Sequence, residues 1–174
     1  FKNISILITA GPTIENIDPV RFVSNKSSGK QGFEIASEFT KRGGKVTLIT
    51  GPVNIPFPNC ENIVQVKTAQ EMLDTVYQQL PADILICSAA VADWKLVPKV
   101  SSNKNIDINN KIKKTSDNLL FKAVENPDIL GTIANSDLRP KIVIGFSAET
   151  NRLKKNAYSK LVSKNVDLII ANDV

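Results

Sequence analysis

Six short apolar runs, separated by segments of helical character, constrain the fold of this chain more than any other feature. Most of the runs are continuous rather than alternating, which is typical of strands in a parallel sheet covered on both faces. Because strand and helix alternate, right-handed crossovers should place helices on both faces of the sheet. We therefore expect an α/β fold, a three-layer α/β/α sandwich with a mainly parallel sheet. The predicted strands are at residues 4–9, 45–50, 63–66, 83–88, 141–146 and 167–171.

The helices between these runs have recognisable ends. Thr68 is followed three residues later by Glu71, which is the pattern of a capping box. Asn126 is expected to cap another helix, with Pro127 at its first position. Gly43 is expected to end the first helix, at residues 29–42. These signals and the apolar spacing predict helices at residues 29–42, from 68, from 126 and at 151–164.

One region interrupts the alternation. Residues 94–115 are polar, rich in Lys, Asn and Ser, and without a clear period. We expect a mobile lid there, followed by a short strand at residues 119–124. No internal repeat and no linker to a second domain is visible, so residues 1–174 are expected to form a single domain. The chain stops directly after its last predicted strand, and we expect the C-terminal end of the domain to be missing.

Composition narrows the chemistry that the chain can perform. It has no histidine, which excludes histidine-based triads and most catalytic zinc sites. Its two cysteines, Cys60 and Cys87, argue against a disulfide framework, and Cys87 falls in an apolar run that predicts core packing. No run approaches the ~20 apolar residues of a membrane helix, and the start lacks the pattern of a signal peptide. We therefore expect a cytoplasmic protein with no membrane partner.

The net charge of +5 is compatible with nucleic acid, an acidic membrane or a phosphorylated small molecule. A basic nucleic-acid-binding module is therefore one alternative. The lysines are spread along the chain, and few aromatic residues lie among them, which argues against a stacking platform for single strands. We accordingly expect no nucleic-acid partner.

The stretch at residues 9–32 carries the most unusual chemistry. It contains a Gly-Pro turn, an Asp-Pro pair, Arg21, Asn25 and a Ser-Ser-Gly-Lys segment before the first predicted helix. Loops in compact domains are usually about 4–6 residues long, and much longer ones are usually functional. Backbone N–H groups at a helix start, together with hydroxyls and cations, favour an anionic ligand.

Standard nucleotide motifs do not fit this stretch. A P-loop needs a hydroxyl residue after Gly-Lys, but Gln31 follows Lys30. A dinucleotide fingerprint needs G-x-G-x-x-G in the first tight turn, whereas only a distant G-x-x-G is present. Neither tyrosine has a lysine four residues on, as a short-chain dehydrogenase would require. A standard NAD enzyme is disfavoured, although an NAD(P)-binding Rossmann-type protein of another function stays as the main alternative.

Taken singly, the polar candidates have ordinary structural interpretations. Asn25 suits a turn, Arg21 a surface ion pair, and Asp93 a helix cap. The run Lys-Ile-Lys-Lys at residues 111–114 suits a solvated basic loop.

Taken together, four blocks resemble a known family. They are DPVRFVSNKSSGK at residues 18–30, AAVADW at 89–94, KIKK at 111–114 with NPDI at 126–129, and GFSAET at 145–150 with ANDV at 171–174. In this order they resemble the phosphopantothenoylcysteine synthetases (phosphopantothenate–cysteine ligases) of the bacterial, CTP-dependent type. The resemblance spans nearly the whole chain. Ser147 and Trp94 depart mildly from the family pattern, in which Ala and Tyr are commoner.

The resemblance implies a Rossmann-like fold and a two-step ligase. The 4'-phosphopantothenate carboxylate would attack the α-phosphate of CTP, giving an acyl-cytidylate and pyrophosphate. The amine of L-cysteine would then displace CMP to form phosphopantothenoylcysteine, on the route to coenzyme A. It further implies Mg²⁺ (or Mn²⁺) accompanying the triphosphate, with no dedicated protein metal site. A homodimer is implied, and the chain is either stand-alone or fused to a flavin-dependent phosphopantothenoylcysteine decarboxylase.

The resemblance also implies roles for individual residues. Asn25 and Lys111 are the expected catalytic residues: Asn25 would donate to the acyl carbonyl, and Lys111 would contact the triphosphate. Arg21, Asn25 and Ala90 are expected on the phosphopantothenoyl side. Contacts with the nucleotide are expected from Ala89, Asp93, Lys111, Pro127, Asp128, Ile129, Leu130, Phe146, Lys160 and Lys164.

Overall fold

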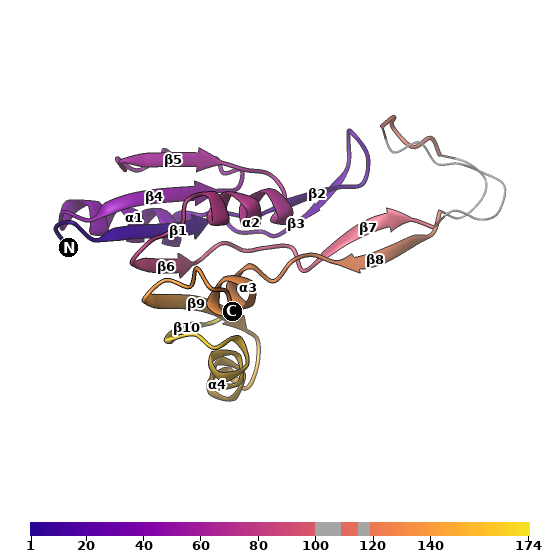
Figure 1. The fold of residues 1–174 in the computed structure, drawn as a ribbon. Coiled ribbons are helices and arrows are strands. Elements are labelled where there is room, and N and C mark those ends of the chain that lie inside the picture. Colours follow the sequence, from indigo (N-terminus) through magenta and orange to yellow (C-terminus); the bar gives the residue numbers. More distant parts are fainter. Residues whose placement is uncertain (100–108, 115–118) are drawn as a thin grey trace.

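The computed structural model describes residues 1–99, 109–114 and 119–174, and its centre is a six-stranded sheet (Figure 1). Every pairing in this sheet is parallel. The strands are β1 (Ser5–Ala10), β4 (Lys45–Thr50), β5 (Asn62–Gln65), β6 (Ile84–Cys87), β9 (Ile142–Glu149) and β10 (Leu168–Asp173). All six lie where the sequence predicts strands, and the α/β prediction with a mainly parallel sheet is confirmed.

The strand order is β10-β9-β6-β1-β4-β5. From β1 the chain first moves to β4 and β5 on one side, then returns to β6 and continues to β9 and β10 on the other. The direction of progress therefore reverses between β1 and β6. In open sheets of this kind, ligands bind beyond the carboxyl ends of the strands at such a reversal.

Two apolar clusters cover the two faces of the sheet. Leu7 of β1 belongs to the cluster under α2 (Ala69–Gln78) and α3 (Ile129–Ala134). Its neighbours Ile6 and Ile8 belong to the cluster under α1 (Lys30–Lys41), with Phe33. All three strand residues are at most 1% exposed, so β1 is buried on both faces, as its continuous apolar run predicts. The third layer is completed by α4 (Leu153–Lys164), which contacts β9, β10 and α3.

The helix ends follow the sequence signals with one exception. Thr68 and Glu71 form the predicted capping box at α2, and Gly43 follows α1 with a positive φ of 82°. The prediction for the third helix was wrong: Asp128, rather than Asn126, caps α3, because its Oδ1 accepts the Gly131 N–H at 3.2 Å. In the part of the chain that the structure describes, no helix is long and apolar enough to cross a membrane.

Two antiparallel hairpins project from the sheet (Figure 1). The first pairs β2 (Ile14–Asn16) with β3 (Phe22–Ser24), inside the stretch expected to be one long loop. The second pairs β7 (Trp94–Pro98) with β8 (Phe121–Glu125). The short strand expected at residues 119–124 is therefore confirmed. Residues 94–98 of the expected mobile lid form the regular strand β7, and residues 100–108 and 115 of that segment lie outside the described residues.

Candidate functional site

A cleft of about 940 Å³ lies beyond the carboxyl ends of the central strands. Ser88 follows β6 and Phe146 lies in β9, while Gln31 contributes from the start of α1. The opposite wall comes from the segment before α3 and from one side of α4. The cleft thus sits at the reversal of strand order, where the topology predicts a ligand.

Most of the residues singled out in the sequence line this one cleft. They come from five separate parts of the chain, which the fold brings together. They are Asn25, Ala89, Ala90, Asp93, Pro127, Asp128, Ile129, Leu130, Phe146, Lys160 and Lys164. Arg21 and Lys111, both within the described residues, are not among those that line it.

Asn25 lies directly after β3, and its side chain reaches across to the strand-end loop of β6. Its Nδ2 donates to the carbonyl oxygen of Ala90 at 2.9 Å. The same carbonyl accepts the N–H of Thr13 at 3.2 Å, and Ala90 N–H donates to Gly11 at 2.9 Å. Since an amide nitrogen carries two hydrogens, this bond orients the Asn25 carboxamide and leaves its second hydrogen available to a ligand.

The loop that carries Asp93 is fixed from the other wall of the cleft. Asn126 donates from Nδ2 to the carbonyl oxygen of Ala92 at 2.9 Å, and from its backbone N–H to that of Asp93 at 2.9 Å. The Asp93 side chain itself stays exposed at the cleft. Asn126 therefore joins the two walls instead of capping α3, which explains the displaced helix start.

Two lysines of α4 point into the cleft from one helix face. Lys160 Nζ donates to the carbonyl oxygen of Phe146 at 2.7 Å. Lys164 Nζ pairs with Oδ2 of Asp128 at 2.6 Å. Both amines are thus held at the cleft by oxygens that an anionic ligand could replace.

Cys87 lines the cleft together with Thr9, whose side chain it contacts. Burial raises the pKa of its thiol to about 12. Because the thiolate is the nucleophilic form of cysteine, this side chain is an inert wall at neutral pH. The prediction that Cys87 packs in the core is met by its contacts with the apolar cluster beneath α2 and α3.

The cleft offers mixed charges and no ready metal site. Its lining includes three lysines, Lys26 among them, and three carboxylates, Asp93, Glu125 and Asp128. Over the described ranges of the chain, no group of three or more His, Cys, Asp or Glu side chains could hold a metal ion.

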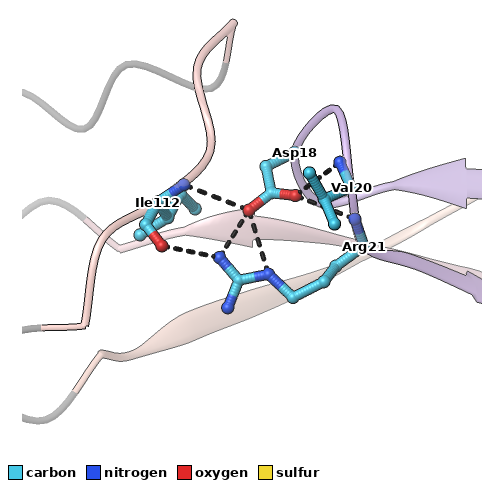
Figure 2. Close-up of polar contacts among 4 residues, drawn as sticks. All are labelled: Asp18, Val20, Arg21 and Ile112. Atoms are coloured by element: carbon cyan, nitrogen blue, oxygen red, sulfur yellow. Dashed lines mark hydrogen bonds and ion pairs between the residues drawn. The ribbon is translucent and has the colours of Figure 1, made fainter.

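Arg21 lies outside the cleft lining, where it and Asp18 bind the backbone of Ile112, the residue after Lys111 (Figure 2). Arg21 donates from Nε to Oδ2 of Asp18 at 3.0 Å, and from a terminal nitrogen to the Ile112 carbonyl oxygen at 2.9 Å. The Arg21 guanidinium is the main reason why the pKa of Asp18 lies well below its usual range, and three backbone N–H groups lower it further. The ion pair that the sequence suggested for Arg21 therefore exists, and its partner, Asp18, is buried.

Sequence reasoning missed several cleft residues and the part played by Asp18. Some lining residues outside the predicted site set lie in the stretch at residues 9–32 or directly after a predicted strand: Thr9, Lys26, Ser27, Gln31, Ser88, Val91, Ala148 and Asn172. The others are Cys87, Trp94, Glu125, Asn126 and Val174. Asp-Pro at a turn signals a side chain that accepts nearby N–H groups, and Asp18 does accept those of Val20 and Arg21, each at 2.8 Å. Its bond to Ile112, 94 residues away, has no local signal.

The sequence model described as the DNA/pantothenate metabolism flavoprotein C-terminal domain matches residues 1–174. The chain belongs to this family. It is 46% identical over 179 residues to the coenzyme A biosynthesis bifunctional protein CoaBC of Escherichia coli (strain K12), covering 100% of this chain and 42% of that protein. The corresponding protein of Haemophilus influenzae is 44% identical over 175 residues, with the same coverage. The chain thus spans about two-fifths of the length of these curated relatives.

Solved structures of this family have the same fold. The crystal structure of the C-terminal domain of CoaBC matches with a TM-score of 0.82 and 38% identity, covering 99% of this chain and 79% of that one. The DNA/pantothenate metabolism flavoprotein of Streptococcus pneumoniae matches with a TM-score of 0.81 and 28% identity, covering 98% and 82%. The family assignment from the four sequence blocks is therefore confirmed, because the chain matches the C-terminal domain of the coenzyme A biosynthesis proteins CoaBC.

Proposed function

We propose that this chain is the phosphopantothenate–cysteine ligase part of coenzyme A biosynthesis, acting through an acyl-cytidylate. The observation that carries the proposal is the convergence of family blocks distant in sequence on one cleft. Membership of a family whose relatives are coenzyme A biosynthesis proteins supports it.

The α3 side of the cleft is proposed to hold the nucleotide. Pro127, Ile129, Leu130 and Phe146 would enclose the cytosine, with Ala89 packing against it. Asp93, whose carboxylate is exposed at the cleft, would accept from the ribose hydroxyls. Lys160 and Lys164 would exchange their present oxygen partners for phosphate oxygens, and charge-assisted bonds of this kind are the stronger ones. Asp128 would then keep its bond to α3.

The first step joins the substrate carboxylate to the α-phosphorus and breaks the bond to pyrophosphate. Phosphoryl transfer of this type depends mainly on positioning and on stabilising charge, so the lack of histidine is no obstacle. We propose that Lys111, which does not line the cleft in this structure, would stabilise the charge that develops on the part of the triphosphate that extends beyond the cleft. Since the described residues offer no metal cluster, Mg²⁺ (or Mn²⁺) would enter as part of the CTP substrate.

The second step forms the amide. The cysteine amine attacks the acyl carbonyl, the carbon–oxygen bond to the cytidylate breaks, CMP leaves, and the amine loses a proton. We propose that the free Asn25 N–H donates to the carbonyl oxygen as negative charge develops there. Ala90 would lie beside the acyl group, and Arg21 is proposed for the phosphopantothenoyl side. The protein is further proposed to be a cytoplasmic homodimer, fused to or working with a flavin-dependent decarboxylase.

Lys111→Gln should slow the first step. The substitution removes the cation while keeping a side chain of similar reach, so less charge is stabilised in the transition state. We expect pyrophosphate release to fall by about 10²-fold with little change in the affinity for cysteine, measured by pre-steady-state release. Lys113→Gln is the matched control, and an equal loss in both variants would contradict a specific role for Lys111.

The function is tested by pyrophosphate release with phosphopantothenate and cysteine, comparing CTP with ATP and omitting each substrate in turn. Release with CTP and phosphopantothenate, and amide only when cysteine is added, supports the proposal. Thermal shifts with a nicotinamide cofactor and none with CTP would instead support the NAD(P)-binding alternative.

A further inference from the structure

We propose that Asp18 is a positioning residue for the ligase reaction, which holds Lys111 in place through Arg21 and the Ile112 backbone. This inference rests on the proposed function for the chemistry of Lys111, while the contact itself is a property of the fold. It is based on a buried carboxylate whose hydrogen bonds reach a segment more than 90 residues away (Figure 2).

The two oxygens of Asp18 have different partners. Oδ1 accepts the backbone N–H groups of Val20 and Arg21 within its own turn. Oδ2 accepts from the Arg21 guanidinium and from the Ile112 N–H at 3.1 Å. One oxygen thus shapes the hairpin turn, and the other faces the distant segment.

Ile112 is bound at both of its backbone groups. Its N–H donates to Asp18, and its carbonyl oxygen accepts from Arg21. Two bonds of opposite polarity fix the orientation of a residue better than one, and this recognition does not depend on the Ile112 side chain. Because Lys111 contributes the carbonyl half of the peptide bond that carries the bound N–H, the position of its Cα is restricted as well.

The exposed fractions of the Asp18 and Arg21 side chains are consistent with a contact that docks residues 111–114 on the hairpin. The Asp18 side chain is 0% exposed, whereas that of Arg21 is 48% exposed. A buried carboxylate is costly unless it is fully hydrogen-bonded, and several N–H donors meet that need here. Release of residues 111–114 would remove one of those donors, so the docked arrangement is favoured.

The hairpin that receives Ile112 also leads into Asn25. Asp18 and Arg21 lie between β2 and β3, and Asn25 is the first residue after β3. The residues proposed for the two chemical steps, Lys111 and Asn25, are therefore attached to one short element. Asp18 contacts none of the three substrates in this scheme and acts only through the segment that it binds.

The test is Asp18→Asn in the full chain. The amide has the same shape, but it places an NH₂ group where one oxygen now accepts, opposite either the turn amides or the Ile112 N–H and Arg21. We expect faster hydrogen exchange at the Ile112 amide, and pyrophosphate release slowed about 10- to 100-fold with unchanged KM for cysteine. Arg21→Lys keeps the charge without the planar fork and serves if Asp18→Asn does not fold. Because Arg21 is itself proposed to bind substrate, this variant tests only the docking, through faster hydrogen exchange at the Ile112 amide.

Asp83→Asn is the matched control. Asp83 also accepts from a backbone N–H, a hydroxyl and a cation, Ser5 and Lys141 being its partners, but it precedes β6 at the opposite end of the sheet. The Asp83→Asn substitution should lower stability and leave the hydrogen exchange of the Ile112 amide and the rate of pyrophosphate release as in the wild type. Unchanged Ile112 exchange in folded Asp18→Asn would overturn the docking. Faster exchange with normal pyrophosphate release would overturn the positioning role, while a wild type without ligase activity would refute only the proposed function.

Discussion

Asn25→Ala is expected to form the acyl-cytidylate and then stall. The substitution removes the carboxamide that Ala90 orients and leaves the cleft otherwise intact. Loss of one donor to a developing oxyanion typically slows a reaction by about 10²–10³-fold. The first step has no carbonyl oxyanion to stabilise, so pyrophosphate should appear in a burst while the amide accumulates at the slower rate. Rapid quench followed by chromatography would measure the cytidylate and the amide together.

Asn135→Ala is the control for this experiment. Its Nδ2 also donates to a backbone carbonyl, that of Gly131 at 2.8 Å, but Asn135 is not among the residues that line the cleft. We expect the control to make amide at the wild-type rate. Full-rate amide formation by Asn25→Ala would exclude the oxyanion role, and loss of the pyrophosphate burst would move Asn25 to the first step.

The sheet could be predicted from sequence because its signals are local and strong. Continuous apolar runs identify strands buried on both faces, and Ile6, Leu7 and Ile8 are buried against the two opposite clusters as such a run requires. The capping box at Thr68 likewise needs only residues within one turn.

The two hairpins were harder to predict because polar sequence hides their pairing. β2 and β3 are three residues each, too short for a periodic pattern to stand out. β7 carries exposed residues on both faces, Trp94 and Val97 among them, since it pairs with β8 outside the main sheet. A strand without a buried face gives no alternation to detect.

The candidate site likewise contains some residues that could be predicted from the sequence and others that could not. Residues near strand ends, such as Ala89 and Phe146, were predictable because parallel strands deliver their carboxyl ends to one edge. Asn126 was misassigned because Asn and Asp both favour caps, and only the tertiary contact with Ala92 decides which of them serves α3. The hydrogen bond between Asp18 and the Ile112 N–H forms only because two distant segments meet in the fold, so no pattern of residue spacing predicts it.

The turn after β4 should tolerate no side chain at Gly51. A Cβ built there would lie 1.6 Å from the Pro12 carbonyl oxygen and 2.7 Å from its carbon. These are backbone atoms, so relief requires moving the Gly11–Thr13 turn. Gly51→Ala should therefore lower the free energy of unfolding by about 3 kcal/mol or more, seen as a lower midpoint in urea at constant slope.

The same displacement should reach the cleft. Pro12 pairs with Ala90 in a parallel bridge, and Ala90 in turn receives the Asn25 side chain, so the folded fraction of Gly51→Ala should also form amide slowly. Gly43→Ala separates this steric effect from the general cost of replacing glycine. It has a positive φ of 82°, but its nearest atoms lie 3.9 Å away, so we expect a loss of about 1–2 kcal/mol and normal amide formation. Gly51 itself has no positive φ. A loss of stability in Gly51→Ala no larger than that in Gly43→Ala would therefore contradict a severe clash between a Gly51 Cβ and Pro12.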